Sequence, residues 1–542
     1  MSVKVMLRGE LWSQHGPTSA RGLAFDSSGR MLSGADLAPI FDGLTNREAW
    51  LSTAAALNGC FAAVRVDNTE IRACVDRLRT YPLFVALEGG DVLVSDDPAL
   101  AAGSISDVHL DPLSFAEFRL TGYVTGASTL VQGLDQVRAG HCLFYAPRQD
   151  VAPGQRKFYE FRHRDFFDDD SQHLTQSLVE THARVFRRLM RSAGDRQIVI
   201  PLSGGHDSRL IGVILRDLGC RNILCYSYGV EGNWEARISR QVADYLGFRW
   251  KLVPYSSARW RTWSALPEFQ RYFRAAGHFA AVPHFQDWPA VYELQRSGDL
   301  AKDAVFVPGH SGDFLAGSHI PLWFEHKARI TRTELLESIF NAHYTLWDWP
   351  RDGRERLRNA LIQRIDKVCG PVVDASPEEA ADQFECWDCQ ERQAKFIVNS
   401  VRVYEFFGYE WRLPLFDSEL MDFWSHVPLE KRVGRSLYFD FARRYQALPV
   451  TPANADRPIA VARALAVIKR SSLWPHAKRL QRVLRRLQWR GQYDGVDGMG
   501  WLALIDREQF RTMYTGREIG HSFFALKYLD AIAPGGVLEH RP

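Results

Sequence analysis

The first 160 residues alternate short apolar runs with turn residues. Runs rich in β-branched and aromatic side chains are bounded by Gly, Asp and Asn, and they occupy residues 58–67, 81–88, 91–97 and 141–147. Runs of this length and composition are typical of β-strands. The pattern predicts an antiparallel sheet layer, which we assign to an N-terminal domain of residues 1–165.

The spacing of apolar residues changes near residue 170. Apolar residues recur at helical spacing between 174 and 190, and either Asp170 or Ser171 is suited to cap the start of this helix. Three unbroken apolar runs, typical of buried parallel strands, follow at residues 197–202, 222–229 and 303–309. Helical patterns follow the first two runs, and the chain beyond residue 320 is largely helical in pattern. This order predicts a doubly wound α/β sheet with a helical extension, in a second domain of residues 170–542.

The loop after the first of these predicted strands carries the most informative chemistry. It reads Ser-Gly-Gly-His-Asp-Ser over residues 203–208 and leads into a predicted helix. Glycines let a backbone approach a ligand closely, and the N–H groups at a helix N-terminus attract anions. Asp207 would repel a phosphate unless it holds a Mg²⁺ ion that bridges to that phosphate. The alternative is a strand-to-helix turn in which Ser and Asp only cap the helix.

This loop resembles the pyrophosphate-binding loop SGGxDS of the ATP pyrophosphatases, and more narrowly the chain resembles the asparagine synthetase group of amide-forming ligases. VFVPGHSGDFLAGSH (305–319) is similar to the second loop of the family, sGeGsDElfgG, although His310 and Phe314 depart from it. YEWRLPLFD (409–417) matches the pattern E-x-R-x-P-x-x-D. YSYGVEGNWEARISRQVADYLG (226–247) resembles the segment that holds adenine and ribose.

The resemblance implies that the chain uses ATP and Mg²⁺. The residues it places at the nucleotide are Ser203, Gly204, Gly205, Asp207, Ser208, Tyr228, Gly229, Glu235 and Gly309. Asp207 and Asp313 are expected to hold Mg²⁺ and to act in catalysis. Glu410 is expected to take the proton of an attacking amine or to orient that amine, and an ion pair with Arg412 or Arg402 is its alternative role.

The family also has a lysine near the phosphates, and this sequence does not identify its counterpart. The candidates are Lys431, Arg435 and Lys469. The activity that the resemblance implies is AMP-forming: the enzyme adenylates a carboxylate, releases pyrophosphate, and transfers the acyl group to ammonia or to a substrate amine.

The N-terminal domain resembles the glutaminase-like, Ntn-type αββα sandwich of the family, through LNGCFAAVRVD (57–67) and CVDRLRTYPLFV (74–85). Members that use glutamine begin with Met-Cys, whereas the second residue here is Ser2. We therefore expect a degenerate sandwich that is inactive as a glutaminase, and a Ser2 nucleophile is the alternative. Members without the Cys include β-lactam synthetase, carbapenam synthetase and the lasso-peptide cyclases. Intramolecular amide closure is thus the second interpretation, and a catalytically silent binding or scaffold relative is the third.

The amino-acid composition limits which classes of partner are expected. The 542 residues include 67 Lys plus Arg and 64 Asp plus Glu, a net charge of +3, so a nucleic-acid partner is not expected. Eight cysteines are too few for a disulfide scaffold, and no apolar run reaches the ~18 residues of a membrane span. We expect free thiols, no membrane partner and a cytoplasmic location.

Residues 463–490 form a basic stretch with nine Lys or Arg and no acid. Leucines interleave with these charges at helical spacing, which predicts an amphipathic helix with a solvated basic face. The alternative is a docking site for a precursor peptide or an acidic partner protein.

Overall fold

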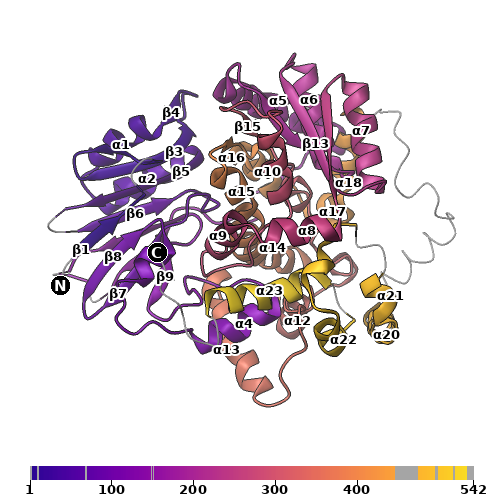
Figure 1. The fold of residues 1–542 in the computed structure, drawn as a ribbon. Coiled ribbons are helices and arrows are strands. Elements are labelled where there is room, and N and C mark those ends of the chain that lie inside the picture. The colour runs from indigo at the N-terminus through magenta and orange to yellow at the C-terminus, as the bar shows by residue number, and fades with distance from the viewer. Residues whose placement is uncertain are drawn as a thin grey trace.

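The computed structural model describes residues 3–8, 11–67, 70–147, 149–150, 152–445, 474–494, 498–516 and 519–533. Ser2, Lys469 and the part of the basic stretch before residue 474 lie outside these ranges. The protein is a mixed α/β structure, with the N-terminal sheets on the left of Figure 1 and the second sheet at the upper right. All eight cysteines lie within the described ranges and are free, which confirms the expected thiols.

Two sheets form the N-terminal part of the molecule. The larger has the order β11 (Gly154–Lys157), β10 (His141–Tyr145), β6 (Ile71–Val75), β5 (Asn58–Val66), β3 (Thr18–Phe25) and β2 (Ser13–His15), with β4 (Met31–Ser33) beside β3. The smaller has the order β1 (Val3–Met6), β8 (Asp91–Ser95), β7 (Phe84–Glu88) and β9 (Leu134–Gln136).

These two sheets face each other across an apolar core. Val64 and Val75 of the larger sheet are buried in one cluster with Val85 and Val94 of the smaller. Helices α1 (Gly34–Asp42) and α2 (Arg47–Ala56) cover the outer face of the larger sheet, and α3 (Pro98–Ala102) packs on the smaller. The layers therefore follow the order helix, sheet, sheet, helix. One detail differs from the prediction, because β1 pairs with β8 in parallel and the sheet is not antiparallel throughout.

The second sheet has five strands, all parallel, as the apolar runs predict. Its order is β14 (Arg249–Tyr255), β13 (Ile223–Val230), β12 (Ile198–Pro201), β15 (Val305–Phe306) and β16 (Glu410–Trp411). The helix before it, α5 (Ser171–Ala193), begins after Asp170, whose carboxylate accepts the N–H groups of Gln172 and His173 at 2.9 Å. Of the two predicted caps, Asp170 is therefore the one used.

The connections of this sheet reverse direction between β12 and β15. From β12 the chain passes through α6 (His206–Asp217) to β13 and through α7 (Trp234–Leu246) to β14. It then returns through α10 (Trp288–Arg296) to β15, on the opposite side of β12. Open α/β sheets bind their ligands at such a reversal, beyond the carboxyl ends of the strands.

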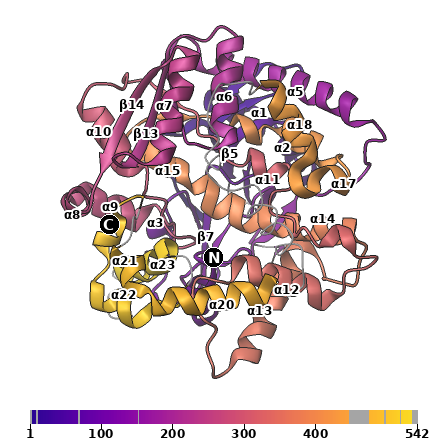
Figure 2. The same cartoon turned by 90° about the vertical axis from the view of Figure 1, so that its right-hand side faces the viewer.

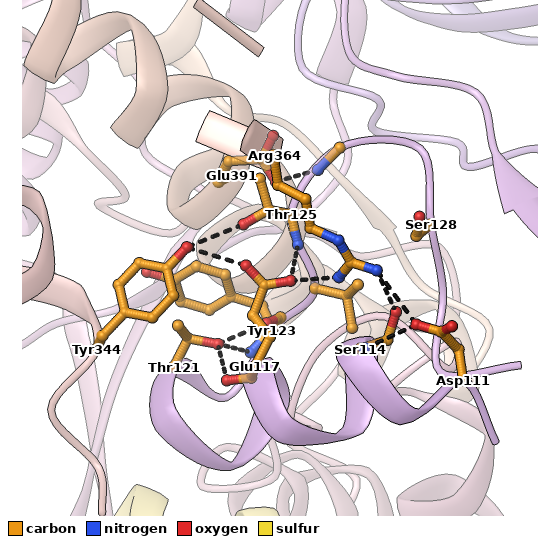
Figure 3. A network of polar contacts seen from close by, with 12 residues as sticks. Asp111, Ser114, Glu117, Thr121, Tyr123, Thr125, Ser128, Tyr344, Arg364 and Glu391 are labelled. Carbon is orange, nitrogen blue, oxygen red and sulfur yellow. Dashed lines mark hydrogen bonds and ion pairs between the residues drawn. The ribbon is translucent and has the colours of Figure 1, made fainter. Parts of the chain in front are cut away.

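The N-terminal sheets are joined to the helical part by buried polar contacts. Glu117 of α4 (Pro112–Thr121) is fully buried and accepts hydrogen bonds from Arg364 at 2.6 Å and Tyr344 at 2.9 Å (Figure 3). It also accepts the backbone N–H of Thr125 at 3.1 Å. The Glu117 carboxylate thus links α4 to Arg364 and Tyr344 of the helical part and to the turn that follows α4.

A second set of contacts, which we call the clasp, holds the loop after α4. The clasp consists of Glu391 and Lys395, in the π-helix Cys389–Ile397, and the backbone of residues 124–126. Lys395 donates to the carbonyls of Val124 and Gly126 at 2.7 and 2.6 Å and to Glu391 at 2.5 Å. Glu391 in turn accepts the N–H of Gly126 at 3.0 Å. Both side chains are almost fully buried, so the Val124 and Gly126 carbonyls and the Gly126 N–H depend on them for their hydrogen bonds.

The C-terminal helices lie on the outside of the helical part. They are α20 (Trp474–Leu487), α21 (Trp489–Asp494), α22 (Arg507–Met513) and α23 (Ile519–Ile532), at the lower front of Figure 2. In the described part of the chain, no helix is long and apolar enough to cross a bilayer.

Candidate functional site

The loop 203–208 connects the buried strand β12 to α6 at the carboxyl edge of the parallel sheet. Gly205 is the residue before α6, and no side chain caps this helix end. The two serines of the loop bond each other, with 3.1 Å between their hydroxyl oxygens, and Ser208 also accepts the N–H of Ser203. Gly204 has no room for a side chain, because a Cβ there would lie 2.6 Å from the ring of Trp234. A helix N-terminus without a capping side chain is suited to an anion.

The second loop, 309–319, follows β15 and contacts the first. A Cβ on Gly309 would lie 2.6 Å from the backbone nitrogen of Ser208, so the two loops touch through backbone. The N–H of Asp313 donates to the Asp207 carboxylate at 3.1 Å. The other carboxylate, that of Asp313, accepts from Ser318 at 3.0 Å. The structure therefore brings together the two acids that the sequence predicts as a pair.

The electrostatics of this pair fit a divalent cation. Burial and the neighbouring Asp313 carboxylate raise the pKa of Asp207 to about 7, against the effect of its hydrogen bonds. Among the described residues no group of three or more His, Cys, Asp and Glu side chains is arranged to hold a metal, so the chain offers two carboxylates here. Mg²⁺ is commonly bound by one or two carboxylates together with substrate phosphates. Asp207 and Asp313 fit that role once a nucleotide is bound.

Two residues of the C-terminal half complete the surroundings of Asp207. Tyr438, on α18 (Ser436–Tyr445), donates its hydroxyl to the Asp207 carboxylate, and no motif in the sequence marks this residue. Arg435 acts on the same carboxylate by its charge, in the direction that lowers the Asp207 pKa. Lys431, in contrast, pairs with Glu430 at 3.5 Å. Of the described candidates for the phosphate-site cation, Arg435 is therefore the one at the site.

The predicted adenine and ribose side lies beside this loop. Tyr228 and Gly229 are at the carboxyl end of β13, the neighbour of β12. The ring of Tyr228 stacks on Tyr255, with 5.3 Å between ring centroids. Gly229 has φ +121°, and a Cβ there would lie 2.8 Å from the Gly498 carbonyl. Glu235 is exposed in the first turn of α7. It follows Trp234, whose ring lies against Gly204 of the loop 203–208.

Glu410 does not lie at this site, which corrects the role predicted for it. It begins β16, opposite Val305, and Val305 is opposite Ile198, the first residue of β12. That level is five residues before Ser203, roughly 16 Å along a strand. The Glu410 carboxylate pairs instead with Arg196 and Arg412, each at 2.7 Å. The motif E-x-R-x-P-x-x-D thus contributes an ion pair at the amino edge of the sheet.

We expect Glu410→Gln to keep pyrophosphate release within about twofold of the unsubstituted protein. The side chain is 57% exposed, and exposed ion pairs contribute about 1 kcal/mol or less to stability. Steady-state pyrophosphate release and a thermal melt of the purified variant test this. A loss of activity larger than tenfold with an unchanged melt would return Glu410 to the reacting groups.

The second loop is held in place by hydrogen bonds that lead to one buried carboxylate, that of Asp388. Ser311 has φ +67°, a conformation that is uncommon for serine, and its hydroxyl donates to Gln393 at 2.6 Å. Gln393 donates to Asp388 at 3.1 Å, and His319 lies 2.6 Å from the other oxygen of Asp388. Both ends of the segment that carries Asp313 therefore connect to Asp388. No local sequence pattern indicated this residue. His319 is 69 positions away, and the π-helix Cys389–Ile397 carries Gln393.

We predict that Asp388→Asn raises the Mg²⁺ concentration needed for half-maximal pyrophosphate release by about 10- to 100-fold, the effect typical of groups that orient metal ligands. The variant loses the charge that holds His319, and the loop is then less fixed. Titration of Mg²⁺ at saturating ATP is the measurement. Gln393→Leu should shift the same curve in the same direction, since it breaks the link from Ser311. An unchanged Mg²⁺ requirement in both variants would rule out this positioning role.

Two sequence comparisons point to the same family as the motifs do. Residues 184–438 match the model of the asparagine synthase family. A probable glutamine-hydrolysing asparagine synthetase of Acanthamoeba polyphaga mimivirus is 36% identical over 94 residues, which is 17% of this chain and 17% of that protein. The alignment thus spans about one sixth of the relative's length. Together the two matches support an asparagine synthetase-like family.

Similarity to solved structures is low. The NH3-dependent NAD synthetase of Campylobacter jejuni is 13% identical, with a TM-score of 0.19, over 28% of this chain and 61% of that one. The NMN synthetase of Francisella tularensis is 12% identical, with a TM-score of 0.19, over 53% and 100%.

Proposed function

We propose that the protein is an ATP-dependent, AMP-forming amide ligase of the asparagine synthetase type. One observation carries the proposal. The sheet reverses between β12 and β15, and each of these strands is followed by a loop whose acid meets the other, Asp207 with Asp313. An uncapped helix N-terminus lies beside them. This combination provides a place for phosphate and a place for its counter-ion at one edge of the sheet.

In the proposed reaction, a carboxylate oxygen attacks the α-phosphorus of ATP and pyrophosphate leaves. When bound, Mg²⁺ supplies the positive charge that neutralises the phosphates. The loop 203–208 and the N-terminus of α6 hold the departing pyrophosphate, and Arg435 adds a cation on the same side. Tyr438 and Ser318 hold the two acids in place. An amine then attacks the acyl-adenylate and releases AMP.

The two departures from the family pattern do not disturb the carboxylate pair. His310 lies 2.6 Å from the hydroxyl of Ser400, and Phe314 is fully buried, with its ring 5.7 Å from that of Phe161. Both side chains are used in packing or in a local hydrogen bond. This favours a working ligase over a catalytically silent relative.

The nitrogen source and the site in the cell are further parts of the proposal. We propose ammonia or a substrate amine as the nucleophile, and intramolecular closure of a peptide or a small-molecule ring is the second candidate.

The N-terminal sheets would then be a retained glutaminase-like sandwich with a structural role, which the clasp at residues 124–126 supports. Free cysteines, six of them buried, agree with a reducing, cytoplasmic location.

ATP–pyrophosphate exchange tests the proposal directly. Purified protein is incubated with ATP, Mg²⁺ and labelled pyrophosphate in the presence of a panel of carboxylates, and then with amines. We expect exchange that depends on a carboxylate and AMP release that depends on an added amine. A protein that binds ATP, exchanges no pyrophosphate with any carboxylate, and releases ADP instead would contradict it.

A further inference from the structure

Helix α20 presents its apolar side to solvent. Leu480, Val483, Leu484 and Leu487 are 63%, 50%, 49% and 74% exposed, and their spacing places them on one side of the helix. We call these four residues the apolar stripe. The amphipathic helix predicted from the sequence is present from residue 474, but its apolar side is not covered by the described part of the chain.

The helix contacts the body of the protein through its opposite side. Arg482 is half-buried, and at 100° per residue it lies roughly 150° from the centre of the stripe. The backbone of Arg482 touches Gly516, where a Cβ would lie 2.1 Å from the Arg482 carbonyl oxygen. Figure 2 shows α20 on the periphery, at the lower front. This orientation is the reverse of that of a helix that covers a core.

The charged residues of this helix are all basic. Residues 474–490 contain six Lys or Arg and no Asp or Glu. Arg479 and Arg486 lie roughly 90–110° from the centre of the stripe, both on the same flank of the helix, and their long side chains extend from that flank. A surface of this kind is complementary to an anionic partner that also accepts apolar side chains.

The shape favours a lipid surface over a protein. Four partly exposed side chains offer much less than the ~800 Å² that each partner buries in a standard protein interface. The stripe is also a convex ridge on a single helix. A strong amphipathic helix with a basic polar side and low mean hydropathy is the type that lies in the headgroup region of a bilayer.

We propose that α20 docks the protein on an anionic membrane surface, with the apolar stripe inserted among the acyl chains and the neighbouring arginines on lipid headgroups. The helix lies parallel to the bilayer and does not cross it. The proposal replaces the sequence-based expectation of no membrane partner, and it is independent of the ligase chemistry.

Co-sedimentation of the full-length protein with vesicles tests this. We expect binding to phosphatidylcholine vesicles that contain about one third phosphatidylglycerol, and little binding to phosphatidylcholine alone. Raising the salt from about 0.05 M to 0.5 M should weaken the binding, because headgroup charges are then screened. The variant Leu480→Gln/Leu484→Gln/Leu487→Gln should bind at least about tenfold more weakly. Arg479→Gln/Arg486→Gln should lose about 30-fold.

The matched control is Val373→Gln, which replaces an apolar side chain that is 57% exposed elsewhere, and it should bind as the unsubstituted protein does. All variants should keep their thermal melts and their pyrophosphate release, which separates this proposal from the proposed function. Absence of binding to anionic vesicles overturns the proposal. So does binding that is unchanged by the leucine substitutions. Self-association that the leucine variant abolishes, without vesicle binding, would assign the stripe to a second copy of the chain instead.

Discussion

Asp207→Asn and Asp313→Asn each reduce ATP-dependent pyrophosphate release by at least about 10²- to 10³-fold, the scale expected when charge stabilisation at a transferring phosphoryl group is removed. Each variant removes one of the two carboxylate charges on loops that are joined by the Asp313 N–H, which donates to Asp207 at 3.1 Å, while the side-chain shape stays the same. Glu410→Gln is the matched control, since it neutralises an acid at the other edge of the sheet. Near-normal activity in either aspartate variant would contradict the two-acid assignment.

The same pair predicts how Mg²⁺ changes stability with pH. The pKa of Asp207 is raised to about 7 in the folded protein, against about 3.9 in an unfolded chain. Between these values the folded state binds more protons, so its stability falls as the pH rises from about 4 to 7. A bound cation offsets this loss. We therefore expect Mg²⁺ with ATP to raise the melting temperature more at pH 8 than at pH 5.

Thermal melts with and without Mg²⁺ at the two pH values measure this effect. In Asp207→Asn the difference between the two pH values should disappear, because the titrating group is gone. A Mg²⁺ effect of equal size at both pH values in the unsubstituted protein would show that the cation binds elsewhere.

Lys395→Met should lower the free energy of unfolding by about 3–5 kcal/mol, the range for removing one partner of a buried ion pair. The substitution leaves the Glu391 carboxylate buried without its cation and leaves the carbonyls of Val124 and Gly126 without their donor. Chemical unfolding followed by fluorescence measures the loss. Because the clasp joins the N-terminal loop to the π-helix, we expect the N-terminal sheets to separate from the helical part first.

Two further variants identify the cause of that loss. Lys327→Met removes a lysine that also pairs with a glutamate, Glu334 at 2.6 Å, but its side chain is 47% exposed, so we expect a loss of about 1 kcal/mol or less. Adding Glu391→Gln to Lys395→Met should restore part of the stability, since a neutral amide still accepts the Gly126 N–H. If the double variant is no more stable than Lys395→Met, an uncompensated charge is not the source of the effect.

The sequence by itself determined the elements and the first pair of site residues. Buried parallel strands are continuous apolar runs, and such runs are local, so β12 and β13 and the helices after them follow from the pattern alone. The glycines and the acid directly after a strand marked the loop 203–208 in the sequence, and the resemblance of residues 305–319 to the family's second loop marked Asp313. Two parallel strands that are adjacent in a sheet bring such loops to one edge, which is why Asp207 and Asp313 meet.

Only the tertiary structure decided which other residues join them. The motif around Glu410 gives no information on register, and the pairing of Glu410 with Val305 places it at the amino edge of the sheet. Tyr438 contacts Asp207 from 231 positions away in the sequence, and Asp388 contacts His319 from 69 positions away. No local sequence pattern encodes contacts of this kind. The apolar stripe of α20 shows the same limit. Helical spacing predicts an amphipathic helix, but which side meets the protein depends on what the rest of the chain presents to it.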